Sequence, residues 1–433
     1  MIPVRAQQLA GFATVLGFSL ASSAAAADWP TWRGNGSGVA EGEYVTEWSA
    51  DSNVRWKTEL PGPGNSSPIV AGSRVFVTQY DPESKARKLL CYATESGDLM
   101  WEASQLSKEE EPTHPTNPYC AASPVTNGEY VVAFFGSAGL CCYDMEGELK
   151  WRKELGSPQH LFGQGASPLI HGDMVTMNYG PGTEQFWVTL ALRDGEEHWR
   201  LPIAKVDAPN PFDQPGGPKL PEGTKLRDPF GTWATPLVVP SDAGYDLVLA
   251  FPNELRAVKP ESGSTTWSSE SIGNQVMSSP MLVDGNVVCL GTTAVSVRPG
   301  GEGDVTDTHS IWFKETDRPR IGTGVATEDS IIANTMQGIV ESIDIKTGER
   351  NWQERLASGS KSAGSWSSLS RAGDSIYAPS KSGTVHVFKA APAFELIATN
   401  ELGETMNSSL AFSDGAIYIR TDKHLWCIAQ PQS

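Results

Sequence analysis

Cysteines and histidines are the residues of this 433-residue chain with the most obvious chemistry, and there are six of the first and seven of the second. Cys141 and Cys142 are adjacent in the apolar stretch GLCCYD, where they are either a redox-active pair or two small side chains in a strand. The sequence has no His-x-x-x-His or Cys-x-x-Cys metal spacing and no Gly-x-Ser-x-Gly nucleophile motif. It therefore predicts no metal site and assigns no catalytic residue.

The composition excludes several classes of partner. There are 51 acidic residues against 33 Lys and Arg, a formal net charge of −18. Binding to a phosphate backbone needs clustered cations, so no nucleic-acid partner is expected, and nothing favours attraction to anionic lipid. The 43 Gly, 30 Pro and 14 Trp suit many short strands joined by tight turns better than helices.

Residues 1–27 have the features of a secretory signal peptide. Arg5 gives a positive start, an apolar stretch runs from Leu9 to Leu20, and Ala24–Ala27 give a small-residue cleavage site. No cysteine follows for a lipid anchor, and no other run is long and apolar enough to span a bilayer. We expect a periplasmic or secreted protein with an N-terminal extension at 28–51 and one folded domain at 52–433.

A small–small–Pro motif followed by two apolar strands recurs along the chain. Five copies begin at Ser66, Ala122, Ala166, Ala234 and Ser278, and three that lack the proline begin at Gly322, Ser367 and Ser408. Each copy is followed by a strand, a Gly turn and a strand that carries Trp, at Trp56, Trp101, Trp151, Trp199, Trp267 and Trp352, with a weaker version at Trp312.

Four strands in a repeat of about forty residues are typical of a propeller blade. The last copy stops after its third strand, in HLWCIAQ, whereas SNVRWKTEL near the N-terminus supplies a spare fourth strand. The sequence thus predicts an all-β, eight-bladed β-propeller of four-stranded antiparallel blades, with the N-terminal strand completing the last blade and hiding an open edge.

The Trp motif resembles a known family. SIDIKTGERNW (342–352), AVKPESGSTTW (257–267) and CYATESGDLMW (91–101) are similar to the tryptophan-docking motif of pyrroloquinoline-quinone-like propellers. DWPTWRGNGSGVAEG and the stretch around GLCCYD resemble secreted planctomycete-type members. More distantly, the chain resembles the propeller lipoprotein that assembles outer-membrane proteins. Each Trp is expected to pack on the turn of the next blade.

The resemblance implies three functions that the fold alone does not separate. Some members are alcohol or sugar dehydrogenases that use pyrroloquinoline quinone and calcium, with paired cysteines in a loop over the cofactor. Here the pair lies in a predicted strand, Cys142 aligns with Cys91 and Ala191, and Cys141 alternates to the other face, which favours a structural role. Cys-x-x-Cys-His is absent, and calcium ligands cannot be assigned.

Residues just before each inner strand should surround one mouth of the channel. They are Asn65, Tyr119, Gln164, Trp233, Gln275, Arg320, Trp366 and Asn407, a polar and aromatic set suited to a small ligand or to a water-filled channel. His114 and His160 lie in loops near this mouth, whereas His171 and His386 fit strand or turn positions.

The Pro/Gly-rich insertion 206–233 leads into one inner strand and either folds over the mouth or lies on the surface; its Asp228 is the obvious carboxylate candidate. We interpret the chain as a non-catalytic binding or scaffold module with an unknown protein or small-molecule partner. The alternatives are a quinone- and calcium-dependent oxidoreductase and a partner-binding factor in outer-membrane protein assembly.

Overall fold

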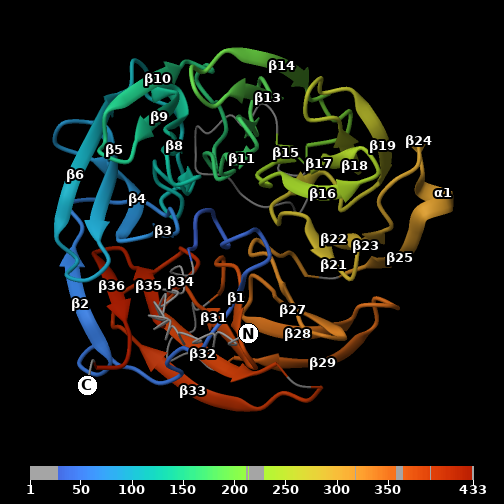
Figure 1. Ribbon diagram of the computed structural model, residues 1–433. Helices are drawn as coiled ribbons and strands as arrows, with labels where there is room; N and C mark the ends of the chain where they lie inside the picture. The colour runs from blue at the N-terminus through green and yellow to red at the C-terminus, as the bar shows by residue number, and fades with distance from the viewer. Residues whose placement is uncertain are drawn as a thin grey trace, which may run out of the picture.

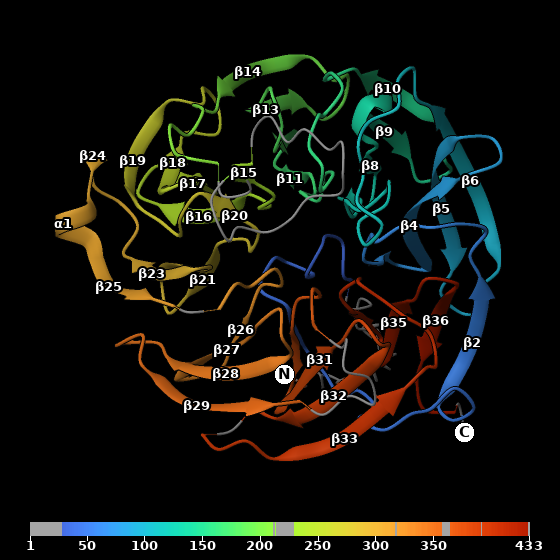
Figure 2. The ribbon, with the colours of Figure 1, turned by 180° about the vertical axis from the view of Figure 1, so that it is seen from behind.

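Eight antiparallel sheets surround a central axis in the computed structural model of the chain (Figure 1). The structure describes residues 28–210, 213, 229–316, 318–356, 364–390 and 392–431. The predicted eight-bladed propeller is thereby confirmed. Seen from behind, the same blades follow one another around the ring in chain order (Figure 2).

The strands of each blade run in order from the channel outward. Blade 1 consists of β3 (Ile69–Ala71), β4 (Arg74–Asp81), β5 (Ala86–Ala93) and β6 (Leu99–Leu106); blade 2 of β7 (Val125–Thr126), β8 (Tyr130–Phe134), β9 (Leu140–Asp144) and β10 (Leu149–Lys153); blade 3 of β11 (Leu169–His171), β12 (Met174–Tyr179), β13 (Phe186–Ala191) and β14 (Glu197–Pro202); blade 4 of β16 (Leu237–Ser241), β17 (Gly244–Phe251), β18 (Glu254–Val258), β19 (Thr265–Glu270) and the short parallel β24 (Gly303–Asp304).

The other four blades follow the same order. Blade 5 consists of β21 (Met281–Val283), β22 (Asn286–Leu290), β23 (Thr293–Val297) and β25 (Ser310–Glu315); blade 6 of β26 (Val325–Ala326), β27 (Ser330–Asn334), β28 (Ile339–Asp344) and β29 (Arg350–Arg355); blade 7 of β30 (Ser370–Ala372), β31 (Ser375–Pro379), β32 (Thr384–Lys389) and β33 (Leu396–Glu401), with β1 (Val39–Ala40) parallel to β30; blade 8 of β34 (Ala411–Ser413), β35 (Ala416–Arg420), β36 (His424–Ile428) and β2 (Val54–Glu59). A small parallel pair, β15 (Gly231–Thr232) and β20 (Gln275–Val276), joins two loops.

The N-terminal strand closes the ring, as predicted. Strand β2 pairs antiparallel with β36, and Trp56 lies opposite Cys427 in this pairing. The last blade therefore contains strands from both ends of the chain, which removes an open edge next to the first blade.

Helical structure is minor in the described residues, where it consists of η1 (Gly136–Ala138) and α1 (Thr306–His309). Neither of these helices is long or apolar enough to cross a lipid bilayer.

Tryptophans on the outer strands fix the spacing between blades. The indole of Trp56 lies over Gly97 in the next blade, where a Cβ atom would come within 2.5 Å of the ring, and its N–H donates to Thr94 O at 2.8 Å. Trp101, Trp151, Trp199 and Trp312 repeat this contact over Gly147, Gly195, Gly263 and Gly348. The positive φ of each Gly and the missing Cβ together make room for a large buried ring.

Two predicted docking residues meet different surroundings. Trp267 lies opposite Gly303 of β24, because the third and fourth strands of blade 5 are joined by a longer loop, residues 298–309, that contains β24 and α1. Trp352 packs edge-on against Phe388 and Phe394 of blade 7. The indoles of Trp267 and Trp352 therefore still pack between blades, although neither lies over a turn glycine.

The adjacent cysteines fill opposite faces of β9. Cys141 belongs to the apolar cluster shared with blade 1, and Cys142 belongs to the cluster shared with blade 3. All six cysteines are buried free thiols, and burial raises the pKa of Cys141 and of Cys142 to about 12. The predicted alignment with Ala191 is wrong: the residue opposite Trp199 is Thr189, which lies six positions before the turn glycine Gly195, as Cys91 lies six positions before Gly97.

Candidate functional site

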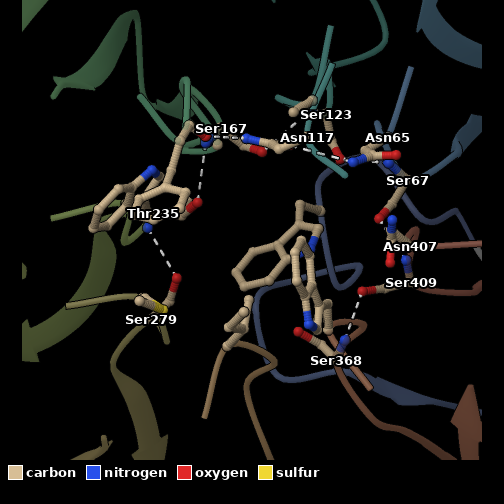
Figure 3. A pocket seen from close by; sticks show the side chains of 18 of the residues that line it. Asn65, Ser67, Asn117, Ser123, Ser167, Thr235, Ser279, Ser368, Asn407 and Ser409 are labelled. Carbon is tan, nitrogen blue, oxygen red and sulfur yellow. Dashed lines mark hydrogen bonds between the residues drawn. The ribbon is translucent and has the colours of Figure 1, made fainter. Parts of the chain in front are cut away.

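A closed ring of hydrogen bonds surrounds the channel. In each blade, the residue at the second position of the small–small–Pro motif donates its backbone N–H to the side-chain hydroxyl of the same position in the next blade. The eight bonds are 2.9–3.1 Å long and join Ser67, Ser123, Ser167, Thr235, Ser279, Thr323, Ser368 and Ser409, the last of which donates back to Ser67. Figure 3 shows seven of these residues, without Thr323, around the cavity.

We call these eight residues the hydroxyl ring. The ring can be recognised in the sequence, but a motif described only as small–small–Pro does not include its defining feature. All eight copies of the motif carry Ser or Thr at the second position, even the three that have lost the proline. If this position required only a small side chain, some copies of the motif would carry Ala or Gly there. The strict hydroxyl is the signal, because only a side chain with an acceptor oxygen can receive the neighbour's N–H.

The N-terminal extension lies across one end of the channel. Trp29 forms an antiparallel bridge with Val70 of blade 1, and Pro30 O accepts the N–H of Thr126 in blade 2. The segment then reaches blade 7, where β1 pairs with β30. The dark blue segment inside the ring in Figure 1 follows this path.

Arg33 holds the extension in place. Its buried guanidinium donates to the carbonyl oxygens of Thr323 at 3.1 Å, Gly324 at 2.6 Å and Leu369 at 2.9 Å, and to two carbonyls of its own loop. Burial lowers the pKa of Arg33 to about 9. The guanidinium thus supplies hydrogen-bond donors to buried backbone carbonyls of blades 6 and 7.

A cavity of about 260 Å³ lies between the N-terminal extension, which contributes Trp32, and the loops at the mouth, which contribute His114 and Asn117. Its apolar wall combines indoles and other large side chains, namely Trp32, Phe162, Trp233, Met277, Ile321, Met336 and Trp366. Its polar wall contains seven hydroxyl-ring residues together with Asn65, His114, Thr116, Asn117 and Asn407. None of the described lining residues is an Asp or Glu.

Four of the predicted mouth residues line the cavity: Asn65, Trp233, Trp366 and Asn407. The amide groups of Asn65 and Asn407 donate to the carbonyl of Thr116 at 2.9 and 3.2 Å, so the loop between blades 1 and 2 leans over the channel. The Trp233 indole donates to Gly163 O at 3.0 Å.

The other four predicted mouth residues have partners outside the cavity wall. The Tyr119 hydroxyl donates to Glu111 O beside Arg87, and Gln164 donates to Pro181 O. Gln275 lies in β20 and donates to Pro229 O. Arg320 forms a buried ion pair with Glu341 and donates to Gly291 O at 3.1 Å.

The histidines divide between the cavity and the blades. His114 lines the cavity and its Nδ1 lies 2.7 Å from Thr116 Oγ1; burial and the nearby Lys381 lower its pKa. His160 packs against Trp233, and His171 and His386 lie in strands β11 and β32. Asp228 lies outside the described residues.

The fold, the docking tryptophans and the channel define a pyrroloquinoline-quinone-like β-propeller. The family model described as "Outer membrane protein assembly factor BamB" matches residues 34–161 and 188–431, so the chain belongs to that family. No curated protein matches the sequence.

Solved structures show the same architecture at low identity. BamB from Moraxella catarrhalis is 15% identical with a TM-score of 0.59, over 86% of this chain and 99% of that one. The quinohemoprotein alcohol dehydrogenase ADHIIG from Pseudomonas putida HK5 is 9% identical with a TM-score of 0.58, over 94% of this chain and 82% of that one. The computationally designed Ika8 protein is 11% identical with a TM-score of 0.55, over 86% and 98%. Such identities establish similarity of fold alone.

Proposed function

We propose that this protein is a non-catalytic binding module that works outside the cytoplasm and holds a small molecule in its channel. The observation that carries the proposal is the cavity itself: it is lined by indoles and hydroxyls and bounded on one side by Trp32, next to Arg33, which is anchored to blades 6 and 7. The described lining has no carboxylate for acid–base chemistry. The predicted signal peptide and the name of the family support the location.

The described residues do not fit the calcium site that a quinone-dependent dehydrogenase would use. Calcium prefers carboxylate and amide oxygens, yet no group of three His, Cys, Asp or Glu side chains gathers anywhere in the described chain. The amide oxygen of Asn117 already lies 3.3 Å from the amide nitrogen of Asn65. The paired cysteines are buried in β9 on opposite faces of the strand, away from the cavity lining.

The test is a titration of the purified protein with pyrroloquinoline quinone, with and without Ca²⁺, followed by tryptophan fluorescence and thermal shift. A cofactor that binds the folded state raises the melting temperature by mass action. We expect no saturable calcium-dependent shift. A saturable shift that requires Ca²⁺, together with dye-linked oxidation of an alcohol or sugar, would replace this proposal with the dehydrogenase.

A second candidate is a role in outer-membrane protein assembly, which the family match favours. The outer strands of two neighbouring blades, β6 and β10, expose Leu99, Met100 and Leu149, and exposed apolar side chains of this kind suit a protein contact. Deleting the gene in its own host should then lower the amount of folded outer-membrane proteins. The variant Met100→Lys should reproduce that loss without a change in melting temperature. Normal levels after deletion would remove this candidate.

A further inference from the structure

The N-terminal extension pairs with the inner edge of some blades. Trp29 exchanges two backbone hydrogen bonds with Val70 of β3, and the extension also accepts the N–H groups of Thr126 in β7 and Arg371 in β30. Val70, Thr126 and Arg371 occupy the same position of the repeat, three residues after the hydroxyl-ring residue. An extended segment therefore already covers this position in blades 1, 2 and 7.

The same position is open in blades 3, 4 and 5, where it is occupied by Ile170, Val238 and Leu282. Their register with the second strand is that of Val70 with Val75, so their N–H and C=O groups point away from that strand, as those of Val70 do. On this side they have no main-chain partner among the described residues. Each inner strand of these blades thus has a free hydrogen-bonding edge.

The side chains at the open position are apolar and lack the cover that the extension gives elsewhere. Leu282 is 38% exposed, whereas Phe412, its equivalent in blade 8, is 1% exposed. Trp29 of the extension packs on the Phe412 ring, with 5.4 Å between the ring centroids. Ile170 and Val238 are half-buried. The open edges therefore offer apolar contacts as well as backbone hydrogen bonds.

A groove of about 230 Å³ runs beside two of these edges. One wall is formed by Leu169, Ile170, Leu237 and Val238, and the other by the extension between Pro30 and Gly36. A strand that pairs with β11 or β16 would place alternate side chains in this groove, because successive side chains of a strand point to opposite faces.

The surroundings of the open edges are acidic. The hairpin turn after each of the three inner strands carries an exposed aspartate, at Asp173, Asp242 and Asp284. None of the three turns contains a Lys or Arg. A cationic partner is attracted to such a rim and an acidic one is repelled.

We propose that blades 3–5 bind an extended, cationic segment of another polypeptide, which adds to their open inner edges. The backbone of the segment pairs with Val238 and its equivalents as Trp29 pairs with Val70. Its apolar side chains enter the groove, and its Lys or Arg side chains lie near the turn aspartates. The interaction needs no ligand in the cavity, so it goes beyond the proposed small-molecule function.

The test uses a blocked seven-residue peptide that alternates Lys with Val, and measures its binding to the purified protein by fluorescence anisotropy. This peptide should bind saturably, at least ten times more tightly than one with Glu in place of Lys or one with every amide nitrogen methylated. Val238→Lys and Leu282→Lys should each weaken binding at least fivefold, because they place a cation in the site. Ile311→Lys, which changes an exposed apolar residue of the outer strand β25, is the matched control and should leave binding unchanged.

Amide hydrogen exchange locates the bound peptide. The peptide should slow exchange at Ile170, Val238 and Leu282 and leave Arg371, whose N–H already has a partner, unchanged. Equal binding of the methylated peptide would mean attraction by charge alone and would reject strand pairing. Absence of binding to folded protein, or protection confined to an outer strand such as β6, would reject the site.

Two safeguards keep the test decisive. If Val238→Lys does not fold, Leu282→Lys and the exchange measurement decide the outcome, since Leu282 is already exposed. The titration with pyrroloquinoline quinone tests the cavity separately, so failure of the peptide to bind leaves the proposed small-molecule function standing.

Discussion

The backbone N–H of Ser409 donates to Ser67 Oγ at 2.9 Å, which joins the last blade to the first beside the channel. At the outer rim, the same two blades are joined by the contact of Trp56 with Gly97. The circle is therefore closed twice, near the axis by a polar bond and at the periphery by a buried aromatic ring. The effect of each of these two contacts on stability can be tested separately.

Replacing Ser67 by Ala removes the acceptor at the closing bond and leaves the buried N–H of Ser409 without a partner. An unsatisfied buried donor costs about 1–3 kcal/mol, and we expect the free energy of unfolding to fall by that amount. Denaturant unfolding measures it. Ser262→Ala is the matched control, because the Ser262 hydroxyl also accepts a backbone N–H but is exposed. Equal effects of the two variants would show that the ring does not stabilise the fold.

A methyl group at Gly97 would collide with the indole of Trp56, because a Cβ there comes within 2.5 Å of the ring. Gly72 also has a positive φ, +53° against +73°, but a Cβ at Gly72 would meet no heavy atom within 4 Å. Gly97→Ala should therefore lower the melting temperature by several degrees more than Gly72→Ala, since overpacking typically costs about 1–3 kcal/mol beyond the backbone strain that both share. Similar melting temperatures would argue against tight docking of Trp56.

Replacing Arg33 by Ala removes the donor that satisfies carbonyl groups of Thr323, Gly324 and Leu369. We expect a loss of about 2–4 kcal/mol in the free energy of unfolding, because hydrogen bonds from a charged donor are among the stronger ones. Amide hydrogen exchange should also speed up across residues 29–40. Arg193→Ala, which removes an exposed arginine, serves as the control. Unchanged exchange would show that the segment stays in place without Arg33.

Buried His171 should make the protein less stable in acid. Its ring nitrogens lie 2.6 Å from Thr176 Oγ1 and 3.2 Å from the Tyr245 hydroxyl, and burial lowers its pKa from 6.5 to about 4. Between those two values the unfolded chain binds a proton that the folded chain does not. The stability that neutral His171 contributes is present above pH 6.5 and declines as pH falls towards 4, by up to about 3 kcal/mol.

The measurement is the free energy of unfolding of wild type and His171→Gln across that pH range. The variant should show a shallower decline than wild type, whereas exposed His198→Gln should follow the wild-type curve. Parallel curves for wild type and His171→Gln would contradict the pKa assignment.

The cysteines should be inert in the folded protein. All six are buried free thiols, and burial raises the pKa of Cys91, Cys120, Cys141 and Cys142 to about 12. A thiol-reactive aromatic disulfide should label none of them under native conditions and all six in denaturant without reductant, because the thiolate is the reactive form. Fewer than six labelled thiols in denaturant would reveal a disulfide and reopen the redox interpretation of GLCCYD.

The sequence predicted the eight blades because each blade repeats a local pattern of strands, turns and a Trp. It also placed β2 in the last blade, since the eighth copy lacks a fourth strand and SNVRWKTEL has no other partner. The alignment of Ala191 was wrong because it followed the small side chain and not the spacing: Thr189 lies ten residues before Trp199, as Cys91 lies ten residues before Trp101.

What the sequence determined by itself is therefore local and periodic: the strand pattern, the turn glycines and the hydroxyl at the second position of each copy of the motif. Only the tertiary structure decided which of those residues meet. Arg33 and Leu369 are far apart in the chain, and nothing in their neighbours marks one for the other. Arg320 precedes an inner strand like Trp366 does, yet it pairs with Glu341 of β28 in the same blade and does not line the cavity, because the buried Glu341 carboxylate would be costly without a cationic partner. Contacts of that kind depend on where the closed ring brings side chains together in space, which no repeat in the sequence records.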